Sequence, residues 1–236
     1  FTNKYKTYQL GYDAQAGEWR VGAAYEYSDG SLNYTSGSGE NKIGAISLYG
    51  TLQGKDNSAL DIVVKRGRIY GDMDIYGKYS DQGDYSTDAT SIGVEYSKRF
   101  DGGNNVYFEP QAQLTFGRID GYDYVSAKGI RVAYDDINSL IGRLGIVGGK
   151  AFSRGDVYVK ASLLHEFSGD SSVTMLAANG ESYMEDQDYG DTWLEVGIGG
   201  NITLGKNCEL YGEVERSFGG DVTKNWGANV GFRYSF

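Results

Sequence analysis

Apolar and polar residues alternate along most of the chain. In the segment 106–116, VYFEPQAQLTF, every second residue from Val106 to Phe116 is apolar, and the residues between them are mostly polar. The segment 226–236, WGANVGFRYSF, repeats this pattern. Such alternation is typical of a β-strand with one apolar face, whereas the helical spacing of apolar residues fits no long window well. The pattern therefore predicts an all-β protein.

About eleven alternating segments follow one another, each about 10–14 residues long. Strands of ordinary globular proteins have ~5–6 residues, whereas a tilted strand needs ~9–11 residues to cross a bilayer. The lengths therefore favour strands that span a membrane. The predicted strands lie near 4–13, 18–28, 43–53, 59–70, 91–100, 105–117, 139–152, 156–167, 192–204, 208–218 and 225–236.

The connections between these segments alternate strictly in length. An antiparallel up-and-down transmembrane β-barrel has this arrangement, with tight turns on the periplasmic side and long loops outside the cell. The connection near 219–224 is short, although its place in the order puts it outside. Short links are predicted at 14–17, 54–58, 101–104, 153–155 and 205–207, and long extracellular loops at 29–42, 71–90, 118–138 and 168–191.

The two faces of the predicted strands differ in chemistry. The apolar face ends in rings such as Tyr8, Tyr12 and Phe116, which suit the boundaries between lipid and water. The other face carries charges, and a base facing lipid at mid-membrane costs ~2–4 kcal/mol. In a lumen the same charges can pair and contact water. The predicted lumen charges are Arg20, Glu26, Lys65, Glu95, Arg99, Glu109, Arg143, Lys160, Glu195, Glu213, Glu215 and Arg233.

Composition excludes several classes of protein. The formal net charge of −10 argues against a nucleic-acid-binding protein, which would carry a basic stripe. The single Cys208 rules out an internal disulfide framework and thiolate zinc sites, and the single His165 rules out sites with two imidazoles. The negative mean hydropathy of −0.46 does not make the chain soluble, because membrane β-strands alternate and average out as polar.

Few residues are candidates for chemistry, and no catalytic residue, cofactor or metal site is expected. His165, in LLHEF, has neither an acid nor a serine at a spacing that indicates catalysis. The tripeptide at 154–156, Arg-Gly-Asp, spells an adhesion motif but lies in a predicted periplasmic turn. An acidic stretch resembles the start of an EF-hand, but the twelfth position is Gly197 rather than glutamate, so a solvated loop is predicted. Its members are Glu181, Glu185, Asp186, Asp188 and Asp191.

The chain resembles the translocator domain of autotransporters, the type V secreted proteins, over nearly its whole length. The last residues, GFRYSF, place aromatic rings at Phe232, Tyr234 and Phe236, which is similar to the signal that the outer-membrane barrel assembly machinery recognises. The other motifs are specific in their combination and order. They are QLGYD (9–13), EPQAQLTFGRIDG (109–121), LIGRLGIVGGKAF (140–152), KASLLHEFSGD (160–170), GDTWLEVGIGGN (190–201) and ERSFGGDV (215–222).

The resemblance implies a 12-stranded barrel in the bacterial outer membrane, with residues 1–236 forming a single translocator domain. It implies an N-terminal passenger, exported to the cell surface, and a linker helix that threads the pore. It also implies periplasmic chaperones, the assembly machinery and the lipid bilayer as partners. The alignment of motifs starts at the family's second strand, so the first strand and the helix are expected upstream of residue 1.

Two other interpretations remain open on the sequence alone. A small porin or passive channel has the same alternation, and a bare signal peptide upstream would favour it over a long passenger. An outer-membrane hydrolase would need a catalytic partner for His165, which activity assays can detect. The translocator is the first interpretation, and it is not an enzyme.

Overall fold

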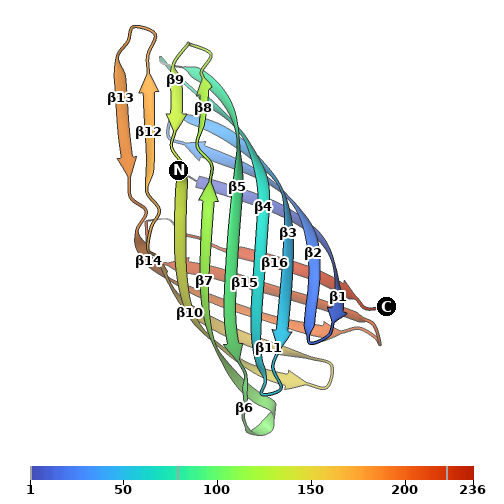
Figure 1. The fold of residues 1–236 in the computed structure, drawn as a ribbon. Coiled ribbons are helices and arrows are strands. Elements are labelled where there is room, and N and C mark those ends of the chain that lie inside the picture. Colours follow the sequence, from blue (N-terminus) through green and yellow to red (C-terminus); the bar gives the residue numbers. More distant parts are fainter. Residues whose placement is uncertain (1, 79, 222) are drawn as a thin grey trace.

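Eleven long strands pair in chain order, each with the next, in the computed structural model (Figure 1), which describes residues 2–78, 80–221 and 223–236. The antiparallel sheet curls round on itself, so that its late strands cross behind its early ones (Figure 1). The strands are β1 (Thr2–Ala16), β2 (Trp19–Tyr34), β3 (Gly37–Gln53), β4 (Ser58–Ile75), β5 (Asp81–Lys98), β7 (Val106–Ile119), β10 (Ile137–Phe152), β11 (Gly155–Glu166), β14 (Asp191–Thr203), β15 (Cys208–Phe218) and β16 (Gly227–Tyr234).

Each predicted segment corresponds to one of these strands, and the predicted links at 14–17, 54–58, 153–155 and 205–207 are tight turns, so the all-β antiparallel fold is confirmed. We call the edge of the sheet that carries the short links the turn end, and the opposite edge the hairpin end. At the hairpin end, β2, β3, β4 and β5 are much longer than predicted. The segments 29–42 and 71–90, expected as long loops, are mostly strand and leave connections of only 35–36 and 76–80.

A second sheet of four strands stands beyond the hairpin end (Figure 1). The expected loop 118–138 contains the hairpin β8 (Tyr122–Val125) and β9 (Arg131–Tyr134). The expected loop 168–191 contains the hairpin β12 (Ser171–Leu176) and β13 (Ser182–Gln187). Strands β9 and β12 pair with each other, so the two hairpins form one antiparallel sheet. These two segments are therefore ordered strands rather than irregular loops.

The single proline marks a break in the main sheet. Continuing the β5–β7 register puts Pro110 opposite Lys98, and Pro110 has no N–H to donate to a ladder. β5 ends at Lys98, and the short strand β6 (Phe100–Asp101) resumes the pairing with β7 on the other side of Arg99. A 3-10 turn, η1 (Gly103–Asn105), then leads into β7. The predicted strand 91–100 is therefore interrupted near its end.

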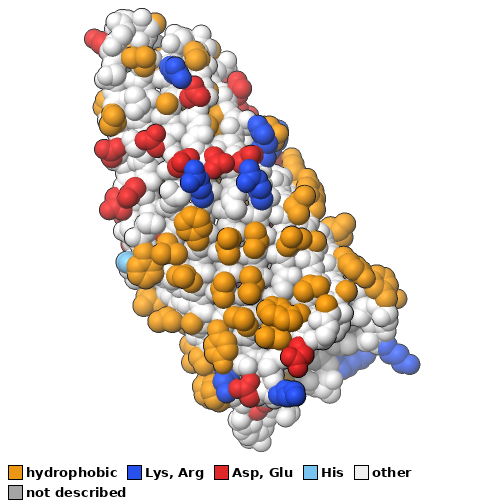
Figure 2. Space-filling model, viewed as in Figure 1, with side chains coloured by type: hydrophobic (Ala, Val, Ile, Leu, Met, Phe, Trp, Pro, Cys, Tyr) orange, Lys and Arg blue, Asp and Glu red, His pale blue; other side chains and the backbone are white. Residues whose placement is uncertain are grey.

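The molecule is apolar outside and polar inside, the reverse of a soluble domain. Large apolar side chains cover the outer surface as a belt (Figure 2), and they include Leu10, 81% exposed, and Leu144, 67% exposed. Among the described residues no large side chain is fully buried. The described part of the chain contains no helix that is long and apolar enough to cross a membrane. The core is replaced by a lumen that the curled sheet encloses.

The two end strands of the main sheet are not paired. Within the described residues, no backbone hydrogen bond joins β1 to β16. Side chains of the two strands meet near the turn end, where the guanidinium of Arg233 lies 3.6 Å from the carboxylate of Asp13 and the rings of Tyr12 and Phe236 lie 6.4 Å apart. The wall therefore has a seam with two free strand edges.

Candidate functional site

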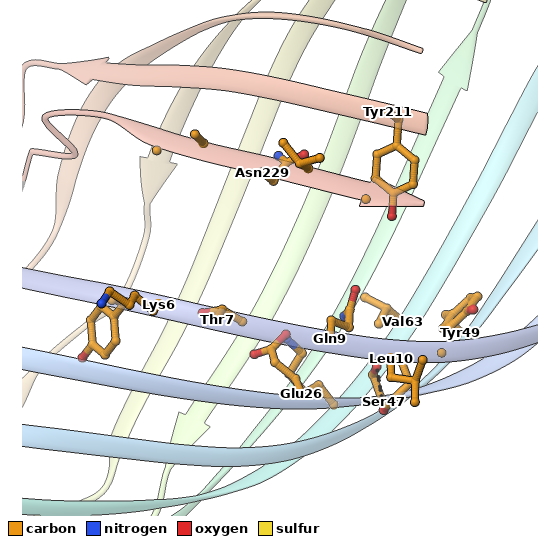
Figure 3. Close-up of a pocket in the computed structure, with 18 of the residues that line it drawn as sticks. Lys6, Thr7, Gln9, Leu10, Glu26, Ser47, Tyr49, Val63, Tyr211 and Asn229 are labelled. Carbon is orange, nitrogen blue, oxygen red and sulfur yellow. Dashed lines mark hydrogen bonds and ion pairs between the residues drawn. The ribbon is translucent and has the colours of Figure 1, made fainter. Parts of the chain in front are cut away.

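The curled sheet encloses a cavity of about 2530 Å³. Side chains from the early strands and from β15 and β16 line it, as Figure 3 shows for Gln9, Glu26, Tyr49, Tyr211 and Asn229. These five residues come from the polar face of their strands, because alternate side chains of a strand point to opposite sides of the sheet. Along β1 and β16, which border the seam, residues of both faces line the cavity. The cavity is the candidate functional site, because charged side chains line it while the outer surface of the sheet is apolar.

Every predicted lumen charge forms an ion pair with a side chain from another strand or connection. Residues that lie opposite each other across strands share a face, so the register brings acids and bases together. Lys65 on β4 lies 2.9 Å from Glu26 on β2. Arg20, Glu26, Lys65 and Arg233 line the cavity directly. Pairing and water together reduce the cost of placing these charges inside a membrane protein.

Arg143 is the hub of the largest polar network. Its guanidinium lies 2.6 Å from the carboxylate of Glu95 and donates to the side-chain carbonyl of Gln113 at 2.7 Å and to that of Gln111 at 3.2 Å. It also donates to the hydroxyl of Ser162 at 3.3 Å. Its side chain is only 15% exposed, and it ties β5, β7, β10 and β11 together across the lumen face.

A chain of alternating charges crosses the late strands. Lys160 on β11 pairs with Glu213 and, at 3.0 Å, with Glu215 on β15. Glu215 also accepts from Lys224 at 2.5 Å, and Lys224 reaches Glu195 on β14 at 3.5 Å. Sequence reasoning missed Lys224, because it lies in the connection before β16 and not within an alternating segment.

A third cluster lies near the turn end. The guanidinium of Arg99 lies 3.6 Å from the carboxylates of both Glu109 and Asp156, and 3.5 Å from the centre of the Tyr107 ring. The Tyr107 hydroxyl donates to Asp156 at 3.3 Å. Asp156 belongs to the tripeptide 154–156, and its contacts make it part of the lumen wall. Sequence reasoning left it out, because it stands at the start of β11.

Asp13 joins the two free edges of the sheet. Its carboxylate lies 3.8 Å from Arg20 on β2 and 3.6 Å from Arg233 on β16, and it accepts from the Tyr49 hydroxyl at 3.5 Å. Sequence reasoning missed it, because it closes a predicted strand. The sequence did contain a signal for Asp13: it directly follows Tyr12, so it lies on the strand face opposite the aromatic rings, which is the lumen face.

Tyrosine rings lie over glycines on neighbouring strands inside the lumen near the turn end. A Cβ added at any of these glycines would collide with the ring, so only glycine lets the ring lie flat on the wall. The glycine-rich composition thus has a packing role. The pairs are Tyr49 over Gly22, Tyr107 over Gly149, Tyr158 over Gly199 and Tyr211 over Gly231.

The structure also shows the contacts of the remaining candidates. His165 contacts the Thr192 hydroxyl at 2.7 Å and packs edge-on against the Phe167 ring at 4.5 Å. In the part of the chain that the structure describes, no group of three or more His, Cys, Asp or Glu side chains could hold a metal ion. Cys208 is a free, half-buried thiol. The terminal rings of Tyr234 and Phe236 lie 5.3 Å apart, edge to face.

An apolar belt, a polar lumen and strands that pair with their chain neighbours define the wall of an outer-membrane β-barrel. The chain belongs to the autotransporter beta-domain family, whose model matches residues 1–215. The pertactin autotransporter of Bordetella parapertussis is 29% identical over all of this chain, and the BrkA autotransporter of Bordetella pertussis is 29% identical over 96% of it. The chain spans about a quarter of the length of these relatives, 26% and 23%.

Solved structures show the same fold. The beta domain of the Bordetella autotransporter BrkA superposes with a TM-score of 0.76 at 24% identity, covering 99% of this chain and 91% of that one. The translocator domain of autotransporter NalP from Neisseria meningitidis gives 0.80 at 13% identity, covering 99% of this chain and 82% of that one. The recognition of an autotransporter translocator in the outer membrane is therefore confirmed, and such a domain is not itself catalytic.

Proposed function

We propose that this chain is the export and anchoring part of a longer protein, and that it moves a passenger joined to its N-terminal side to the cell surface. The supporting observation is the cavity of about 2530 Å³, whose wall carries acidic and basic side chains that are paired with each other. Such a wall offers hydration to a sliding backbone without a strong binding site. For this function, the turn end of the sheet faces the periplasm and the hairpin end faces the outside of the cell. The chain is not an enzyme in this proposal.

The seam between β1 and β16 supports a further strand upstream. Single-chain bacterial barrels have an even number of strands, and a free edge in lipid leaves backbone groups unsatisfied at several kcal/mol each. A strand that precedes β1 would pair with it and with β16, and a linker helix ahead of that strand would occupy the cavity. Residues 1–236 alone should therefore fold poorly in lipid, and an extension of about 30–40 upstream residues should restore a heat-modifiable barrel.

Export is tested with the full-length protein, carrying an epitope tag at the start of the passenger. Protease added to intact cells should remove the tag while the barrel remains in the outer membrane. A tag that stays in the periplasm, with an inserted barrel that conducts ions, would favour the porin interpretation. The assembly machinery and periplasmic chaperones are proposed partners, through the terminal residues Phe232, Tyr234 and Phe236.

A further inference from the structure

A layered band of charge runs around the outer surface directly above the apolar belt. Figure 2 shows basic side chains next to the belt and a row of acidic ones beyond them, toward the hairpin end. This band faces away from the lumen, because Val63, Lys65 and Thr115 line the cavity and their neighbours along β4 and β7 point outward. The side chains of this outer band take no part in the lumen ion pairs described above.

The register fixes the order of the layers on β4, β5 and β7. The uppermost apolar row consists of Val64, Ile92 and Phe116, which lie opposite one another on neighbouring strands. Two residues further along each strand, the next row consists of Arg66, Thr90 and Arg118. The acidic row comes after it. Its acidic members are Asp88 on β5 and Asp120 and Asp136 on the connections beyond β7, while β4 contributes Arg68, which lies opposite Asp88.

The basic row has the geometry of a phosphate site. Arg66 and Arg118 stand on either side of Thr90, two strand spacings or about 10 Å apart. Arg66 donates to the Thr90 hydroxyl at 3.4 Å, so one guanidinium and one hydroxyl already converge. Guanidinium groups bind phosphate through paired, charge-assisted hydrogen bonds.

The arginines are accessible, although they have acidic partners. Arg66 is 65% exposed, and it shares Asp88 with Arg68, so two guanidinium groups have one carboxylate between them. Arg118 contacts Asp120 at 3.0 Å and Asp136 at 2.6 Å. Exposed pairs of this kind contribute little net stability, so a phosphate can compete for them. The carboxylates lie on the water side, which leaves the membrane side of each arginine open to a ligand.

The adjoining apolar row selects a lipid over a free anion. Val64, Ile92 and Phe116 are each more than two-fifths exposed directly below the arginines. A ligand that fits both rows has a phosphate at the level of the arginines and acyl chains against the belt. We propose that Arg66, Thr90 and Arg118 bind the phosphorylated headgroup of a lipid in the outer leaflet, beside the apolar row of β4, β5 and β7.

The test uses the full-length protein, folded in micelles of a zwitterionic detergent, with phosphorylated lipid A as the probe. Native mass spectrometry measures the affinity from the bound fraction. The double variant Arg66→Gln with Arg118→Gln should bind about 25-fold more weakly, at about fivefold for each arginine near a membrane surface. The matched control Arg131→Gln lies on β9, away from the belt, where Arg131 is similarly exposed and paired with Asp123. It should leave binding unchanged.

A third variant makes the result independent of folding defects. Asp88→Asn removes the carboxylate that competes for Arg66 and Arg68, so it should tighten lipid A binding. Dephosphorylated lipid A should bind the wild-type protein as weakly as phosphorylated lipid A binds the double variant. Full binding by the double variant, or equal binding of both forms of lipid A, would overturn the proposal. Displacement of lipid A by millimolar inorganic phosphate would overturn the assignment to a lipid.

Discussion

A single residue's odd or even position along a strand decides whether it meets lipid or water. Leu114 and Thr115 are neighbours on β7, yet Leu114 is 52% exposed on the outer belt and Thr115 lines the cavity. This alternation was readable from the sequence, and so were most of the inward charges. Among those missed, Asp156 stands at the start of β11 and Lys224 lies in a connection, where alternation has few neighbours to define a face, whereas Asp13 follows Tyr12 within β1 and its face could have been predicted. Their partners depend on cross-strand register, which sequence alone does not specify.

Replacing Leu114 with arginine should destabilise the barrel by about 2–4 kcal/mol, because a base would face lipid near mid-membrane. Thr115→Arg is the matched control, and it should cost much less because its side chain enters the hydrated lumen. Gln113 is unsuitable as a control, since it accepts a hydrogen bond from Arg143. The free energy of unfolding from lipid vesicles measures both variants. Equal losses would show that the inner and outer faces are assigned wrongly.

Gly149→Val should destabilise the barrel by about 1–3 kcal/mol, because an added side chain forces the Tyr107 ring away from the wall. Displacing that ring also disturbs its contact with Arg99. Gly148→Val is the control on the same strand, where a Cβ meets open space. It should be neutral in the same unfolding experiment. A control as unstable as Gly149→Val would mean that strand glycines are needed for backbone flexibility and not for ring packing.

At the scale of elements, the alternation of apolar and polar residues located the strands, but several predicted strands stopped short of the observed ones at the hairpin end. Polar residues on both faces are typical of loops, and the sequence there was interpreted as loops. Outside the membrane a strand needs no apolar face, because cross-strand pairing alone can extend it. The residues 37–42 of β3 and 71–75 of β4 are paired in this way. The pairing of β9 with β12 joins segments about 40 residues apart, which no local pattern could reveal.

Stacked tyrosines fasten the four-stranded sheet to β5. The ring of Tyr122 lies 4.4 Å from that of Tyr85 and 4.8 Å from that of Tyr134. Burial, together with the nearby Tyr134 and Tyr85 hydroxyls, raises the pKa of Tyr124 to about 12, and burial also raises the pKa of Tyr122 well above its ordinary value. Because these pKa values are raised on folding, the stability they contribute is complete below about pH 10 and is lost as pH rises through about 12.

The absorbance of ionised tyrosine tests this fastening. At about pH 11 the folded variant Tyr124→Phe should show nearly the same tyrosinate absorbance as the wild-type protein, because the Tyr124 hydroxyl is still protonated. In denaturant at the same pH, the variant should lose the signal of one tyrosine. Loss of that signal in the folded state would show that Tyr124 is solvated and that the sheet is not held by this cluster.

At the scale of the whole molecule, the proposed assembly signal lies at an edge of the wall. Phe236 is 95% exposed at the turn end, beyond the last residue of β16. Deleting Phe236 should lower the amount of protease-resistant barrel in the outer membrane, if the terminal ring completes the proposed recognition pattern and lies at the lipid boundary. Phe218→Ala removes an exposed ring from the hairpin end and is the control. Unchanged barrel levels with limiting assembly machinery would contradict the assignment.

The strands of the wall differ greatly in length from one side of the molecule to the other. β4 and β5 have 18 residues each, whereas β15 has 11 and β16 has 8. At about 3.3 Å per residue, β4 is longer than β15 by about 23 Å along the strand. The rim of the wall at the hairpin end is therefore slanted: it is high beside β4 and β5 and low beside β15 and β16. If the chain exports a passenger as proposed, the shortest way out of the lumen is over this low side of the rim, next to the seam.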